Sequence, residues 1–159
     1  MLGFYETISQ IADIKIMSVL MALLVVVLYA QGYKKEMYKI LSCSVTALFI
    51  TYSLKYLLKV PRPLNMLVVE DGYRFPSGHA TLAAVLMVLG IYYARKCIKD
   101  KGLRYAAYMA SVLWFVVVSY ARIYLGVHIF IDVIVGGFIG AVSTFAVLKA
   151  FRHFHYYRK

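Results

Sequence analysis

The sequence predicts an all-α protein: a polytopic transmembrane helix bundle with about five transmembrane helices plus a short N-terminal amphipathic helix. Of its 159 residues, 63% are hydrophobic and 16% are charged, which is more apolar than an ordinary soluble domain of this size. The apolar residues gather in stretches of about 17 to 25 residues, the length that crosses a bilayer as a helix. These stretches are continuously apolar rather than alternating, which favours helices over a membrane β-barrel.

The length fits a single integral membrane domain over residues 1–159. Residues 1–14 carry Phe4, Tyr5 and Ile8 on one helical stripe and are predicted to form an amphipathic helix in the interface; a disordered terminus is the alternative. Residues 15–150 are assigned to the transmembrane bundle and 151–159 to a basic cytoplasmic tail. The five expected spans are approximately Ile16–Tyr33, Lys39–Leu58, Ser77–Ala94, Leu103–Ala121 and His128–Leu148.

The basic residues predict how the helices are oriented. If five helices alternate, twelve of the eighteen lysines and arginines fall on one side, which should be cytoplasmic. The net charge of +11 is therefore explained by membrane orientation rather than by nucleic acid. The interpretation is an integral protein of a bacterial inner (plasma) membrane whose C-terminus is cytoplasmic. The twelve residues are Lys34, Lys35, Lys39, Arg95, Lys96, Lys99, Lys101, Arg104, Lys149, Arg152, Arg158 and Lys159.

The ionisable residues near the expected hydrocarbon all fall at the outward ends of the helices. A charged side chain at the centre of a membrane helix costs about 2.5–3.5 kcal/mol on insertion scales, so such residues usually have a function. Each one alone has an ordinary structural explanation, such as a lysine that extends to the interface. Their shared depth predicts a single polar site formed by Lys55, Arg62, His79, Arg122, His128 and Asp132.

The chemistry of these residues suits a phosphate. Pro76, Ser77 and Gly78 are typical of a helix start, where free N–H groups and the helix dipole bind anions. The planar guanidinium groups of arginines match phosphate oxygens. His128 and Asp132 are four residues apart on one helical face, so the carboxylate can orient the imidazole and stabilise its charged form.

Small residues in the last expected span predict close helix packing. Gly136 and Gly140 form a GxxxG spacing, with Gly137 beside them. The two cysteines, Cys43 and Cys97, are interpreted as free thiols.

The polar residues resemble the three signatures of the phosphatidic acid phosphatase type 2 (PAP2) family of membrane lipid phosphatases. Six residues separate Lys55 from the pair Arg62-Pro63, as in the first signature. The tetrapeptide from Pro76 to His79 matches the second. Arg122, His128 and Asp132 match the third, although Ala121 replaces its serine and leaves one supporting hydrogen bond in question. The family commonly has six transmembrane helices, whereas five are expected here.

The resemblance implies a mechanism and a role for each residue. His128 would attack phosphorus and form a phosphohistidine, oriented by Asp132, while His79 would act as general acid and then as general base. Lys55, Arg62, Arg122 and the N–H groups of Ser77 and Gly78 would bind the phosphate. No metal and no cofactor are expected. The substrate would be a lipid phosphate in the bilayer, approached from the periplasm or outside, with phosphatidylglycerol phosphate, undecaprenyl diphosphate, phosphatidic acid and lipid A 1-phosphate as candidates.

Several alternatives stay open at this stage. A phosphotransferase that passes the phosphoryl group to a second lipid would use the same residues. Vanadium haloperoxidases share the signature but are larger and soluble, and an anion-binding channel or scaffold would need no catalysis. Glu70 and Asp71 are interpreted as part of a solvated loop, with a role in gating the substrate as the alternative.

Overall fold

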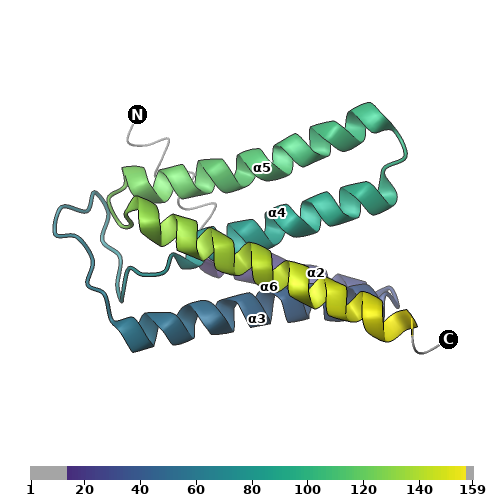
Figure 1. Cartoon of the computed structure of the whole chain (residues 1–159), viewed down its shortest axis with the longest axis horizontal. Helices are drawn as coiled ribbons and strands as arrows, with labels where there is room; N and C mark the ends of the chain where they lie inside the picture. Colours follow the sequence, from purple (N-terminus) through teal and green to yellow (C-terminus); the bar gives the residue numbers. More distant parts are fainter. Residues whose placement is uncertain (1–13, 157–159) are drawn as a thin grey trace.

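All five expected spans are helices in the structure, a computed structural model that describes residues 14–156 (Figure 1). This part of the chain contains no β-strand, so the all-α prediction is confirmed. The helices are α2 (Ile14–Ala30), α3 (Lys34–Leu58), α4 (Gly78–Cys97), α5 (Lys101–Tyr124) and α6 (Phe130–Tyr156).

Four of these helices, α3 to α6, are long and apolar enough to cross a membrane. The other helix, α2, has only 17 residues, slightly fewer than the approximately 20 of a typical span. The predicted amphipathic helix falls in residues 1–13, outside the described residues. The predicted tail begins inside α6, because this helix continues to Tyr156.

The helices extend further into the charged segments than hydropathy predicted. The second span was expected to begin at about Lys39, but α3 begins at Lys34 and buries Lys39. The third span was expected to end at about Ala94, but α4 continues to Cys97. Backbone hydrogen bonding does not require an apolar side chain, and long basic side chains can extend from a helix toward water. Cys43 and Cys97 are both free, as predicted.

Helix α4 lies at the centre of the bundle and packs against α3, α5 and α6. Its contact with α6 is the closest, because a Cβ atom at Gly136 would collide with the backbone oxygen of Ser77, and one at Gly140 with the backbone oxygen of Thr81. The predicted packing role of these glycines is confirmed. The start of α6, which carries Asp132, is thereby held against the start of α4.

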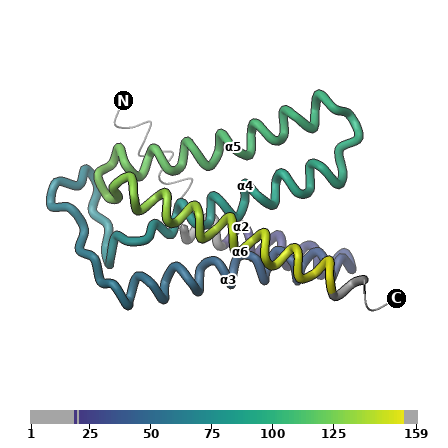
Figure 2. Tube along the Cα trace, in the orientation of Figure 1, coloured from purple at the N-terminus to yellow at the C-terminus, as the bar shows by residue number. Residues whose placement is uncertain are grey.

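The two ends of the bundle differ in structure. One, called the loop end here, holds residues 59–77, which connect α3 to α4, and residues 125–129, which connect α5 to α6 (Figure 2). These two connections are joined by a hydrogen bond from the N–H of Leu67 to the oxygen of Leu125, at 3.0 Å. Between the two ends, large apolar side chains such as Phe49 and Phe138 are exposed, as expected for a surface that contacts lipid.

Candidate active site

The first turn of α4 is capped by Ser77, whose side-chain oxygen accepts a hydrogen bond from the N–H of Ala80. The N–H of Ser77 itself donates to the backbone oxygen of Asp132 at 3.0 Å. This donor was expected to face a phosphate, and the structure corrects that expectation. The N–H of Gly78 makes no hydrogen bond among the described residues and stays available for an anion.

His128 and Asp132 form a buried pair. Nδ1 of His128 lies 3.4 Å from Oδ2 of Asp132, and the same oxygen accepts a hydrogen bond of 2.9 Å from the N–H of Ile129. This second bond fixes the carboxylate relative to the backbone just before α6. Because Asp132 faces Nδ1, Nε2 is left as the nitrogen of His128 that can react.

Burial lowers the pKa of His128 from its ordinary 6.5 to about 4. The main cause is desolvation, which disfavours the charged imidazolium, and the positive charges of Arg122, Arg62 and Lys55 act in the same direction. The interaction with Asp132 opposes them. The imidazole is therefore neutral at physiological pH, which is the state in which it can act as a nucleophile.

Arg74 is a site residue that the sequence analysis missed. Its Nη1 atom donates to both carboxylate oxygens of Asp132, at 3.1 Å each. The side chain of Asp132 is fully buried, and Arg74 provides the positive charge that such a carboxylate needs. The sequence does place Arg74 two residues before Pro76, in a loop at the same end as His128, and this could have indicated a role in the site. It was not chosen because an arginine in a loop is usually solvated.

Lys55 and Arg62 bind the backbone of the loop end. Nζ of Lys55 donates to the backbone oxygen of Tyr73 at 2.5 Å. The guanidinium of Arg62 donates to the backbone oxygens of Gly72, Asp71 and Val127, each at 3.1 Å. Arg62 therefore links the connection before α4 to the connection before α6. Both side chains therefore fix the backbone of the loop end at the site, in addition to any ligand that they bind.

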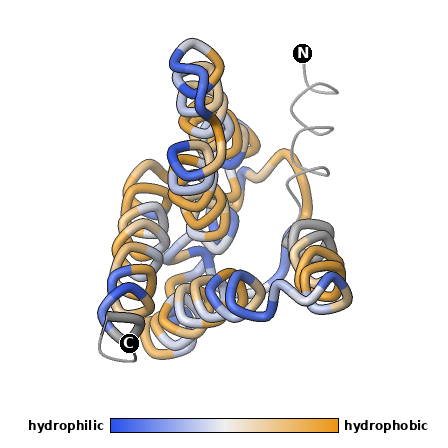
Figure 3. Tube along the Cα trace, turned by 90° about the vertical axis from the view of Figure 1, so that its right-hand side faces the viewer, coloured by the Kyte–Doolittle hydropathy of each residue, from blue (hydrophilic) through white to orange (hydrophobic). Residues whose placement is uncertain are grey.

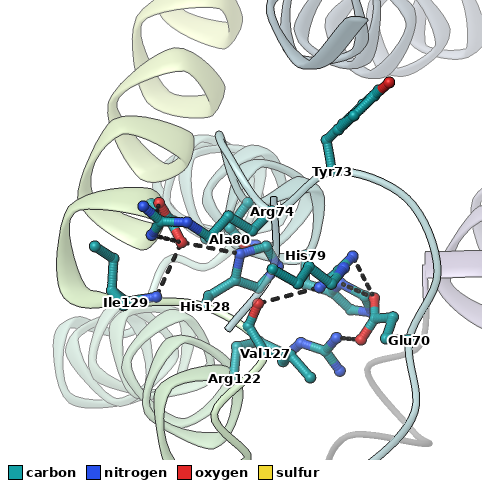
Figure 4. Close-up of polar contacts among 12 residues, drawn as sticks. Glu70, Tyr73, Arg74, His79, Ala80, Arg122, Val127, His128 and Ile129 are labelled. Carbon is teal, nitrogen blue, oxygen red and sulfur yellow. Dashed lines mark hydrogen bonds and ion pairs between the residues drawn. The ribbon is translucent and has the colours of Figure 1, made fainter. Parts of the chain in front are cut away.

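Glu70 reaches into the cationic cluster. Its carboxylate forms ion pairs with Arg62 at 3.4 Å and, more closely, with Arg122, and it lies 4.0 Å from Nδ1 of His79. The prediction that Glu70 belongs to a solvated loop is therefore wrong, whereas its neighbour Asp71 is exposed. The carboxylate occupies the place expected for a bound anion (Figure 4).

The close-up shows His79, Arg122 and His128 in one cluster with Glu70 and Arg74 (Figure 4). His79, Arg122 and His128 come from three segments: the start of α4, the end of α5 and the residues just before α6. His79, Arg122 and His128 are all buried. Ala121, in place of the serine of the PAP2 signature, is buried next to Arg122. Residues 14–156 contain no group of three or more histidine, cysteine, aspartate or glutamate side chains arranged to hold a metal ion.

Comparison with known proteins identifies the family. The model of the PAP2 superfamily matches residues 36–156. The chain belongs to the PAP2 superfamily. It is 37% identical over 89 residues to phosphatidylglycerophosphatase B of Bacillus subtilis, an alignment that spans 54% of this chain and 42% of that protein. The chain thus covers less than half the length of this relative.

Two solved structures have a similar fold. The crystal structure of the transmembrane PAP2-type phosphatidylglycerolphosphate phosphatase from Bacillus subtilis matches 96% of this chain and 76% of that chain, with a TM-score of 0.81 and 23% identity. The crystal structure of Aquifex aeolicus LpxE matches 93% of this chain and 85% of that chain, with a TM-score of 0.68 and 22% identity. At these identities the two structures establish the transmembrane PAP2 fold.

Proposed function

We propose that the protein is an integral membrane phosphatase that hydrolyses a phosphate monoester or a diphosphate of a membrane lipid through a phosphohistidine. The observation that carries the proposal is the buried pair of His128 and Asp132 in a cluster of cationic side chains. A neutral imidazole supported by a carboxylate is a suitable nucleophile for phosphorus. Membership of the PAP2 superfamily supports the same reaction.

In the first step, Nε2 of His128 attacks the phosphorus atom, and the bond between phosphorus and the leaving oxygen breaks. His79 gives its proton to that oxygen, so the lipid leaves as an alcohol, or as a lipid monophosphate if the substrate is a diphosphate. Asp132 stabilises the positive charge that develops on the imidazole of His128. A phosphohistidine remains.

In the second step, water attacks the phosphorus atom of the phosphohistidine. His79, now neutral, takes a proton from this water, and the phosphorus–nitrogen bond breaks. Inorganic phosphate leaves, and both histidines return to their initial states. During both steps, Arg62, Arg122, Lys55 and the N–H of Gly78 stabilise the negative charge on the phosphoryl oxygens. These groups supply positive charge without a metal, so we expect activity to persist in excess chelator.

The proposed substrate class is a lipid with a terminal phosphate. Phosphatidylglycerol phosphate is supported by the identity to phosphatidylglycerophosphatase B. Undecaprenyl diphosphate and lipid A 1-phosphate present the same group at the same depth. In this proposal the loop end faces the periplasm or outside of a bacterial inner membrane, because the basic residues gather at the other end of the bundle.

The test is phosphate release by the purified protein from a panel of these lipids, compared between the wild type and His128→Ala. We expect the substitution to reduce release by about a thousandfold or more, because the nucleophile is lost. His153→Ala is the matched control, since it removes a histidine from the far end of α6 and should leave turnover unchanged. Thermal melting shows whether each variant is folded.

Three results would contradict the proposal. Near-normal phosphate release from a folded His128→Ala variant would exclude this nucleophile. Transfer of labelled phosphate to a second lipid, without free phosphate, would identify a phosphotransferase instead. Failure of vanadate to compete with the lipid would argue against phosphate binding at this cluster.

A further inference from the structure

A second charged region lies at the opposite end of the bundle from His128. It is a cavity of about 760 Å³ between the start of α3, the end of α4 and the end of α6. We call this the basic cavity. Figure 3 looks at this end of the molecule, where hydrophilic segments gather at the ends of apolar helices. The basic cavity is lined by Lys35, Glu36, Lys39, Tyr92, Arg95, Lys96, Phe145, Leu148, Lys149, Phe151 and Arg152.

Among the described residues, the lining contains six cations and one carboxylate. Glu36 accepts hydrogen bonds from Lys39 at 3.0 Å and from Lys96 at 2.8 Å. The hydroxyl of Tyr93 donates to the same carboxylate at 2.8 Å. Glu36 is thereby fully engaged by groups of α3 and α4, and it fixes the two helices relative to each other at the floor of the cavity.

The remaining four cations have no acidic partner among the described residues. Within residues 14–156, no salt bridge includes Lys35, Arg95, Lys149 or Arg152. They come from three helices that converge on one cavity. Cations held close together repel one another, and a bound anion relieves that repulsion.

The other lining residues are apolar or aromatic. Tyr92, Phe145, Leu148 and Phe151 form this part of the wall, and Nζ of the buried Lys39 lies 5.7 Å from the ring centre of Tyr92. Phe145 is 67% exposed on the surface that contacts lipid. A small soluble anion needs only the cations, whereas an amphiphile needs both kinds of lining.

We propose that the basic cavity binds the phosphodiester headgroup of an anionic phospholipid, in the leaflet opposite the catalytic cluster. The uncompensated cations contact the phosphate, and the aromatic and leucine side chains contact the glycerol region and the upper acyl chains. Lys and Arg side chains near a membrane surface attract anionic lipids, and each one adds to the affinity. Positive charge for orientation alone would not require a cavity or its apolar wall.

Two triple variants separate a specific site from general positive charge. The first, Arg95→Gln with Lys149→Gln and Arg152→Gln, removes three exposed cations that line the basic cavity. The second, Lys99→Gln with Lys101→Gln and Arg104→Gln, removes three cations at the same end of the bundle that do not line it. Both are made in the His128→Ala protein, so that no lipid is hydrolysed. The two variants have equal net charge.

The measurement is the shift in melting temperature of each detergent-solubilised protein on titration with phosphatidylserine, phosphatidylcholine or glycerol 3-phosphate. We expect phosphatidylserine alone to stabilise the parent and the second variant. The first variant should bind phosphatidylserine at least about tenfold more weakly, since three cations are lost. Equal shifts in both triple variants would overturn the proposal in favour of general surface charge. A shift with glycerol 3-phosphate as large as that with phosphatidylserine would overturn it in favour of a soluble anion.

Discussion

Asp132 is held in place by three groups from different parts of the loop end. The N–H of Ile129 and Nη1 of Arg74 donate to its carboxylate, and Nδ1 of His128 lies 3.4 Å away. A buried carboxylate is stable only if charge and hydrogen bonds replace the water that it loses. Arg74 provides the charge, so the orientation of His128 depends on a residue that has no direct contact with it in the hydrogen-bond network.

Arg74→Met therefore removes the positive charge next to Asp132 without touching the histidines. We expect kcat to fall by about tenfold to a hundredfold, by analogy with groups that orient the ligands of a metal site, with little change in KM. Arg74→Lys should recover part of the loss, because Nζ can also donate to the carboxylate. Steady-state kinetics of the two variants provide the measurement. Equal losses in both, or a change in KM alone, would contradict a positioning role.

The lowered pKa of His128 predicts the behaviour of the enzyme in acid. Since its pKa in the folded protein is about 4 rather than 6.5, the imidazole stays neutral as the pH falls from 6.5 toward 4. We expect the loss of kcat/KM caused by protonation of His128 to have its midpoint near pH 4. The same shift destabilises the fold below pH 6.5, where the unfolded chain takes up a proton that the folded chain does not.

A pH profile of the wild type, with a histidine NMR titration of the folded protein, checks this prediction. A midpoint for His128 near 6.5 in the NMR titration would contradict it.

At the scale of elements, the glycines of α6 set the position of the site. Gly136 lies against the backbone oxygen of Ser77, which is the cap of α4. The same contact region includes the hydrogen bond from the N–H of Ser77 to the oxygen of Asp132. Close approach of α6 to α4 thus brings His79 and Asp132 to one end of the bundle.

Gly136→Ala should move α6 away from α4, because backbone atoms cannot move aside as a side chain can. We expect a loss of stability of about 1–3 kcal/mol, as for other overpacked sites, and a loss of activity of at least about tenfold. Gly137→Ala is the matched control, since a Cβ there meets only the ring of Phe115. Thermal melting and phosphate release measure the two effects. Equal losses in the two variants would show that the contact with Ser77 has no special role.

The elements themselves could be predicted from the sequence because their apolar runs are long and continuous. Most of the signature residues could be placed too, since they stand at or next to helix ends whose positions hydropathy fixes, whereas Arg62 lies in the connection after α3. The contacts of Glu70 and Arg74 could not be predicted, because both residues lie in the connection of residues 59–77. This segment has no sequence periodicity that would indicate the direction of a side chain. The hydrogen bond of the Ser77 N–H could not be predicted either, because its acceptor, Asp132, belongs to a helix distant in sequence.

For the whole molecule, the difference between the two ends predicts its orientation in the membrane. The loop end carries the proposed catalytic cluster, and the other end carries the basic cavity. Asn65, in the loop end, and Cys97, at the end of α4, are both exposed. The two positions therefore report on opposite faces of the membrane.

Asn65→Cys should react with an impermeant thiol reagent added to spheroplasts, because the loop end is expected to face outward. Cys97 should react only after lysis, and it serves as the internal control in the same protein. Mass spectrometry of labelled peptides distinguishes the two sites. The reverse order of labelling would invert the proposed orientation.

If the cluster binds phosphate as proposed, Glu70 limits which ligands it accepts. Any phosphate that binds Arg62 and Arg122 has to displace a carboxylate that already pairs with them. A phosphodiester of the bulk bilayer carries one negative charge, the same as the carboxylate of Glu70. Its replacement of Glu70 therefore gains little electrostatic energy. A terminal phosphate carries about 1.5 to 2 negative charges at neutral pH, and the exchange favours it. In the proposed reaction, and in a membrane where diesters outnumber monoesters, this internal competitor would keep the cations available for the scarcer, more highly charged headgroup.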